Sequence, residues 1–136
     1  VRYQTHVEKY GWRDNVYDGQ ASGSSGESKR LEGIKIKLTD NLYSGGIQYR
    51  THCETYGWLP WVSDGAMSGT SGESKRLEAI QIELTGEISE VYDVYYRVHC
   101  EYYGWMEWVK NGQVAGTSGE SKRLEAIEIK LVPKEK

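Results

Sequence analysis

The chain has 136 residues, a formal net charge of −3 and a sequence pI near 5.7. This length predicts one compact domain, and the acidic balance argues against a nucleic-acid partner, because no positive field meets the phosphate backbone. No apolar run approaches the roughly 18–20 residues of a membrane-spanning helix, so we expect no membrane span. Phenylalanine is absent, whereas tyrosine (11) and tryptophan (5) are frequent, which favours surfaces where rings are half buried and half wet.

One heptapeptide, Gly-Glu-Ser-Lys-Arg-Leu-Glu, occurs three times without substitution, at Gly26–Glu32, Gly72–Glu78 and Gly119–Glu125. The segments around it align without gaps inside each unit, which divides a single domain (1–136) into repeats 1–46, 47–92 and 93–136. An internal period of this size indicates a repeat array or a closed symmetric barrel or prism. Because every acidic residue of note is triplicated, whereas an active site usually needs one asymmetric set of groups, repeated binding is favoured over catalysis.

Each repeat begins with a predicted strand, clearest at Tyr96–Glu101, where apolar and polar residues alternate. A Tyr-Gly-Trp motif follows, and then a predicted hairpin whose turn, Asn111-Gly112 in the third repeat, is typical of a type I′ turn with positive φ at both positions. In the heptapeptide we expect a single helical or 3₁₀ turn capped by Ser121. A last strand, Ile127–Leu131, alternates cleanly.

No segment has helical length and periodicity, so the chain is predicted to be all-β. The joins between repeats, Thr39–Ile47 and Thr85–Tyr92, are short and polar, so that neighbouring repeats should pack directly on one another. Closure of three such repeats removes sheet edges that an open stack would expose. We therefore expect a pseudo-threefold, β-prism-like domain, with a β-trefoil as the alternative.

The tryptophans divide into two sets if the strand before the turn is regular. One set occurs in every repeat, as core residues would: Trp12, Trp58 and Trp105. On the other face, Trp61 and Trp108 correspond to Asn15, and a position that accepts both residue types must reach water. Trp61 and Trp108 are therefore candidate sugar-binding platforms, because indole faces pack on the apolar faces of sugar rings. Packing between sheets is the alternative.

The heptapeptide is the second candidate binding region. Its charged side chains offer hydrogen bonds to hydroxyl groups, and the arginine fork suits carboxylates or sulfates. The candidates in the second and third repeats are Glu73, Lys75, Arg76, Glu120, Lys122 and Arg123. The alternative is a turn whose Glu–Lys and Glu–Arg pairs serve only the fold.

Cysteine and histidine also occupy equivalent positions. Cys53 and Cys100 correspond to Val7, which favours buried thiols, although a bridge stays open if the two Cα atoms lie within about 7 Å. The histidines, each two residues before a glutamate, would bind Zn²⁺ only if they met near the symmetry axis. A hydrogen-bonded structural role is preferred for all three histidines, His6, His52 and His99. No cofactor is expected.

The third repeat carries a long signature, composed of Tyr103-Gly104-Trp105, Trp108-Val109, Asn111-Gly112, Ala115-Gly116-Thr117, Gly119 and Lys122–Ile127. This signature resembles the ChW repeat, the clostridial hydrophobic repeat with a Gly-Trp motif, and all three units resemble it. Repeat 1 departs from it, because it lacks the second tryptophan and has Gly33 where the others have alanine. The resemblance implies an extracellular protein of Gram-positive bacteria, whose repeats anchor attached domains to polysaccharide, cell wall or host surface. It implies no catalytic residues.

These observations together predict a non-catalytic, carbohydrate-binding or cell-wall-binding module, secreted or at the bacterial cell surface and monomeric as a domain. Its expected ligand is polysaccharide, peptidoglycan or a host glycan, bound through repeated exposed aromatic sites. A protein–protein interaction, assembly or adhesion module that meets a surface protein is the alternative, since Trp and Tyr are equally common in interface hot spots. No Ser/His/Asp order, P-loop or dinucleotide fingerprint is present, so we expect no enzyme.

Overall fold

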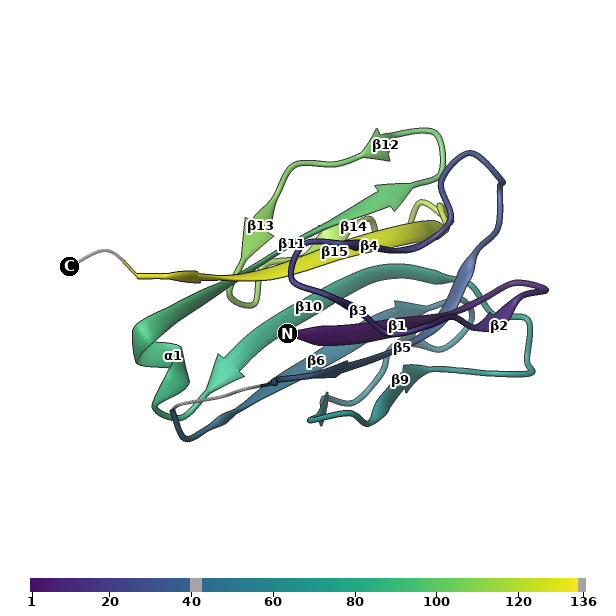
Figure 1. Ribbon diagram of the computed structural model, residues 1–136. Helices are drawn as coiled ribbons and strands as arrows, with labels where there is room; N and C mark the ends of the chain where they lie inside the picture. The colour runs from purple at the N-terminus through teal and green to yellow at the C-terminus, as the bar shows by residue number, and fades with distance from the viewer. Residues whose placement is uncertain (40–42, 135–136) are drawn as a thin grey trace.

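The protein folds into three antiparallel sheets around one shared core, as the computed structural model shows for residues 1–39 and 43–134 (Figure 1). Within these residues the chain is almost entirely β, and the single helix, α1 (Ile88–Val91), lies in the join between repeats 2 and 3. The predicted all-β, prism-like arrangement is confirmed. Part of the other join, residues 40–42, lies outside the described residues.

Each sheet is built on two long strands of one repeat: β1 (Arg2–Val7) with β5 (Leu31–Lys37), β6 (Gly46–Cys53) with β10 (Leu77–Thr85), and β11 (Tyr92–Cys100) with β15 (Leu124–Pro133). Two short strands of the same repeat pair with the first long strand: β2 (Gly11–Trp12) and β3 (Val16–Tyr17), β7 (Gly57–Trp58) and β8 (Val62–Ser63), β12 (Gly104–Trp105) and β13 (Val109–Lys110).

The fifth strand of each sheet comes from another repeat: β9 (Met67–Gly69) pairs with β5, β14 (Ala115–Gly116) pairs with β10, and β4 (Ala21–Gly23) pairs with β15. Repeats 2 and 3 thus each complete the sheet of the preceding repeat, and repeat 1 completes the sheet of repeat 3. This exchange closes the three sheets into a ring, so that no repeat has a complete sheet by itself.

The predicted turn is present, but the predicted hairpin is wrong. Asn111 and Gly112 have φ angles of 45° and 84°, as a type I′ turn requires. The strand that enters the turn, β13, pairs within its own sheet, whereas the strand that leaves it, β14, pairs with β10. The reason lies in the turn itself, where the Gly112 N–H donates to the Ile82 carbonyl of the preceding repeat at 2.7 Å and directs the chain to the neighbouring sheet.

The helical turn expected in the heptapeptide is also absent. Ser121 has a φ of 55°, and the equivalent Ser28 and Ser74 have φ angles of 56°. A helix N-cap residue takes an extended conformation, so this left-handed backbone excludes the expected cap. The segment instead makes an irregular turn that leads directly into the last long strand of each repeat.

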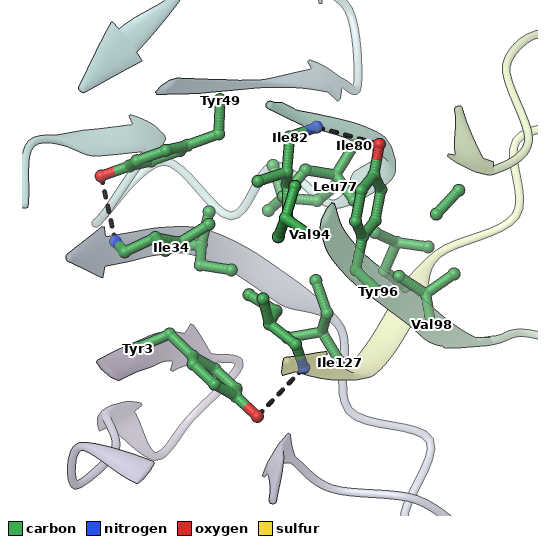
Figure 2. Close-up of a cluster of buried hydrophobic side chains, with 14 of the residues drawn as sticks. Tyr3, Ile34, Tyr49, Leu77, Ile80, Ile82, Val94, Tyr96, Val98 and Ile127 are labelled. Carbon is green, nitrogen blue, oxygen red and sulfur yellow. Dashed lines mark hydrogen bonds between the residues drawn. The ribbon is translucent and has the colours of Figure 1, made fainter. Parts of the chain in front are cut away.

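Three tyrosines in the core connect the repeats to one another (Figure 2). The Tyr49 hydroxyl donates to the carbonyl of Ala66 in its own repeat and accepts the N–H of Ile36 in repeat 1 at 3.0 Å. Tyr96 and Tyr3 are fully buried and make the equivalent pairs of hydrogen bonds toward repeats 2 and 3, respectively. Each hydroxyl therefore satisfies a donor and an acceptor that belong to two different repeats.

The two cysteines are buried, unbridged thiols. They occupy the core position that Val7 occupies in repeat 1, and all three side chains are fully buried. Burial raises the pKa of Cys53 and of Cys100 to about 11, so both thiols stay protonated at neutral pH. The sequence left open buried free thiols or a disulfide bridge, and the structure shows buried free thiols.

Candidate functional site

The outer faces of the sheets carry the tryptophans. Along β11, the alternation places Tyr96 and Val98 in the core and Arg97 and His99 on the outside. Trp105 packs edge-on against His99, with ring centroids 5.4 Å apart at 85°, and the same pairs form in the other repeats. The expectation that Trp12, Trp58 and Trp105 belong to the core is therefore wrong, since all three are half-buried on the outside.

The tryptophans were assigned to opposite faces on the assumption that the strand before the Asn111-Gly112 turn is regular. In the structure this strand is broken. Residues 106–108 lie between β12 and β13 and belong to neither strand, so strict alternation does not hold across them. Met106 and Val109 pack against the core. Trp105 and Trp108 consequently lie on the same side of the sheet, instead of on opposite faces.

An arginine lies against both tryptophans in repeats 2 and 3. In repeat 3, the Cζ atom of Arg97 is 4.8 Å from the ring centroid of Trp105 and 5.0 Å from that of Trp108. In repeat 2, Arg50 is 4.9 Å from Trp58 and 5.1 Å from Trp61. A guanidinium over an indole face is attracted by the ring quadrupole. We call each set of two tryptophans and one arginine an aromatic–arginine platform.

The guanidinium group of each platform arginine makes one side-chain hydrogen bond, and its other N–H groups are available as donors. Arg97 donates its Nε–H to Glu128 at 2.7 Å, and Arg50 donates its Nε–H to Gln81 at 2.7 Å. Arginine has five N–H donors, and within the described chain the terminal nitrogens of Arg50 and Arg97 have no hydrogen-bond partner. Each platform thus presents aromatic rings beside unused N–H groups.

The two platforms differ in how open they are. Trp61 is 36% exposed, which confirms that its position reaches water. Trp108 is half-buried, and the Lys130 Nζ lies 4.4 Å from its ring centroid. Repeat 1 has no platform, because Gln4 and Asn15 take the places of the arginine and the second tryptophan.

The heptapeptide arginines are engaged in ion pairs. In repeat 2, Arg76 contacts Glu54 through Nη1 at 2.9 Å and Glu78 through Nε at 2.8 Å. Glu78 is buried and also pairs with the Nδ1 of His52 at 2.9 Å, so that this buried carboxylate is satisfied by two partners. Repeats 1 and 3 repeat the arrangement. The predicted structural role of the histidines is thereby confirmed.

These ion pairs surround an open polar depression where the three repeats converge. Its volume is about 460 Å³, and three sets of equivalent side chains line it: Glu8, Ser28, Arg30, Glu54, Ser74, Arg76, Glu101, Ser121 and Arg123. The candidates Arg76 and Arg123 therefore come together here, each already bonded to two carboxylates. In the described residues, no group of three or more His, Cys, Asp or Glu side chains is placed to hold a metal ion.

The other heptapeptide candidates bond to residues near the Tyr-Gly-Trp motif. Glu73 and Glu120 accept hydrogen bonds from the hydroxyl groups of Tyr56 and Tyr103, respectively. The Lys75 Nζ donates to Thr55 at 3.4 Å, and the Lys122 Nζ lies 4.2 Å from the Tyr102 ring centroid. None of these four candidates lines the depression, and they belong to neither platform.

A family model, described as ChW, Clostridial hydrophobic W, matches the chain at residues 6–40, 52–86 and 99–133. The chain belongs to the ChW family. Each match covers one ChW repeat, from its histidine to the end of its last long strand or at most three residues beyond it. The resemblance noted in the sequence is therefore confirmed. The comparisons with curated proteins and with solved structures found no match. No helix in the described residues has the length and apolar character needed to span a membrane.

The two platform arginines of the ChW repeats are candidate functional residues that were not predicted from the sequence. Arg50 and Arg97 stand two residues before the histidine in repeats 2 and 3, whereas repeat 1 has Gln4. The arginine therefore occurs only in the repeats that have the second tryptophan. That joint occurrence was a readable signal, because groups that lie in contact tend to change together.

Proposed function

We propose that this ChW module is a non-catalytic extracellular binding module, secreted or held at a bacterial cell surface. Its ligand is a polysaccharide, peptidoglycan or host glycan, bound at the aromatic–arginine platforms of repeats 2 and 3. The observation that carries this proposal is the position of Arg50 and Arg97, each stacked against two tryptophans on the outside of a sheet.

The chemistry of a platform fits a sugar. A pyranose ring has an apolar C–H face and a rim of hydroxyl groups, and an aromatic ring with a polar neighbour offers a partner for each. Here the indoles supply the apolar contact and the terminal guanidinium nitrogens supply donors. The platforms belong to two different sheets of one body, so a polymer that engages both is held by multivalency even where a single site is weak.

Replacing Trp61 and Trp108 by asparagine, the residue at the equivalent Asn15, is expected to reduce retention on an insoluble glycan at least tenfold. Tenfold corresponds to about 1.4 kcal/mol, a modest loss for two stacking contacts. The measurement is a pull-down on peptidoglycan, mucin, cellulose and xylan, repeated with soluble sugar as competitor. Because Trp61 is the more open of the two, Trp61→Asn should cause more of the loss than Trp108→Asn.

Tyr102→Ala is the matched control, because this ring is 84% exposed and lies outside both platforms. It should be retained like the parent. Equal retention of parent and W61N/W108N would contradict the platform assignment. Failure of the parent to bind any of the glycans would reject the glycan ligand and leave the protein–protein interaction as the function to test.

A further inference from the structure

The outer face of repeat 1 differs chemically from those of repeats 2 and 3. Where they have a second tryptophan, it has Asn15, and a small pocket of about 80 Å³ opens there. This exceeds the space that a single water molecule needs. Among the side chains that line it are Arg2, Lys35 and Lys37, together with the amides of Gln4 and Asn15.

The cations of this pocket are arranged against the usual pairing rules. Arg2 lies directly opposite Lys37 in the register of β1 and β5, and like charges at opposed positions of an antiparallel pair are destabilising. The same two positions in repeat 2 hold Gln48 and Glu83, which are hydrogen-bonded to each other. Repeat 1 therefore has a repulsive pair where repeat 2 has a favourable one.

The next pair on the outer face of the same two strands repeats this contrast. In repeat 3, Arg97 lies opposite Glu128 and forms an ion pair with it at 2.7 Å. In repeat 1, Lys35 lies opposite the neutral Gln4, and its Nζ is instead 4.4 Å from the ring centroid of Trp12.

Among the residues that the structure describes, no carboxylate pairs with these cations. In the part of the chain that the structure describes, no Asp or Glu oxygen lies within 4.0 Å of the side-chain nitrogens of Arg2, Lys35 or Lys37, and Asp14 and Asp18 of the adjoining segment do not line the pocket. Arg2, Lys35 and Lys37 thus place three positive charges without a described carboxylate partner around one pocket, in a protein whose net charge is −3.

We propose that the outer face of repeat 1 binds the sulfate or phosphate esters of an anionic polysaccharide. A tetrahedral oxyanion can present an oxygen to each of several cations, and the planar fork of Arg2 matches two of them. Anion binding also removes the repulsion between Arg2 and Lys37. This site uses none of the platform residues and stands independently of the function proposed for repeats 2 and 3.

The test compares three polymers with one backbone: dextran sulfate, dextran phosphate and unmodified dextran. The parent protein should bind at least one of the ester forms and not dextran, with an affinity that falls as salt is raised. The variant R2Q/K35Q/K37Q should bind the esters at least tenfold more weakly. The charge-matched control K9Q/K110Q/K134Q alters three exposed lysines outside the pocket and should change binding less than threefold. Comparing dextran sulfate with dextran phosphate tells which ester is preferred.

Thermal unfolding supplies a second readout, measured on R2Q/K37Q, which leaves the contact of Lys35 with Trp12 in place. Because this variant removes the repulsive cross-strand pair, its unfolding midpoint should be equal to or above that of the parent at low salt. A loss of binding together with a lower midpoint would mean that the cations serve the fold, and it would overturn the proposal. Equal binding of dextran and its esters, or equal losses in variant and control, would overturn it as well.

Discussion

Raising the pH from about 9 to 12 is expected to remove most of the stability of this protein. The core contains ionisable groups that are neutral when buried. Burial raises the pKa of Tyr3 and Tyr96 to about 12 and that of Cys53 and Cys100 to about 11, whereas the exposed groups of an unfolded chain titrate near 10 and 9. Burial also raises the pKa of Tyr49.

The sign of the effect follows from proton linkage. Above pH 9 for the thiols and above pH 10 for the tyrosines, the unfolded chain releases protons that the folded protein keeps, so stability falls with rising pH. The stability that these buried groups contribute is fully present below the pKa values of the unfolded chain. It is lost as the pH rises through the pKa values of the folded protein. A pKa raised by two units in the folded protein corresponds to a loss of about 3 kcal/mol of unfolding free energy per group. The two thiols and two tyrosines together account for on the order of 10 kcal/mol. Since small domains have about 5–15 kcal/mol in total, unfolding by pH 12 is expected.

Urea unfolding followed by circular dichroism at intervals between pH 8 and pH 12 measures this loss. The chain itself offers the control, because Val7 fills the cysteine position in repeat 1. The variant Cys53→Val with Cys100→Val should lose less stability between pH 9 and pH 11 and keep the later loss due to the tyrosines. Lysine deprotonation acts equally on parent and variant. A parent whose unfolding free energy is constant to pH 12 would contradict the prediction.

Local patterns correctly predicted the long strands and the turn at Asn111-Gly112, because their causes are local. The alternation of Tyr96–Glu101 corresponds to β11, and Asn111-Gly112 forms the expected turn. The pairing of β14 with β10 was not predicted, because it depends on contacts across repeats, such as the Tyr96 hydroxyl with the Ile82 N–H at 3.1 Å. Periodicity within one repeat contains no information about such a contact.

The candidate site was predicted in part. The comparison of Trp61 and Trp108 with Asn15 identified a surface position correctly, because a polar residue in one symmetric copy is evidence of contact with water. The partners of these rings were missed, since the irregular segment around Glu107 brings Trp105 to the same side as Trp108. A rule of strict alternation holds only while the backbone stays extended.

Gly116→Ala is expected to lower the free energy of unfolding by about 3–5 kcal/mol, from strained backbone and overpacking together. Gly116 has a φ of 98°, and a Cβ there would lie 2.5 Å from the Glu78 carbonyl oxygen and 3.0 Å from the Ala79 Cα. Both atoms belong to the backbone of the preceding repeat and cannot rotate away. Gly119→Ala is the control, because its φ is 85° but no atom lies within 4 Å of the added Cβ. It should cost about 1–2 kcal/mol.

The same substitution at Gly23 tests whether the ring of sheets closes. Gly69 and Gly116 join consecutive repeats, but Gly23 joins repeat 1 to repeat 3, where its Cβ would lie 2.4 Å from the Glu125 carbonyl oxygen. In a closed ring the three junctions are equivalent, so urea unfolding should give Gly23→Ala and Gly69→Ala the same cost as Gly116→Ala. A cost for Gly23→Ala as small as that of Gly119→Ala would mean that β4 does not pair with β15 in solution and that the three repeats form an open stack.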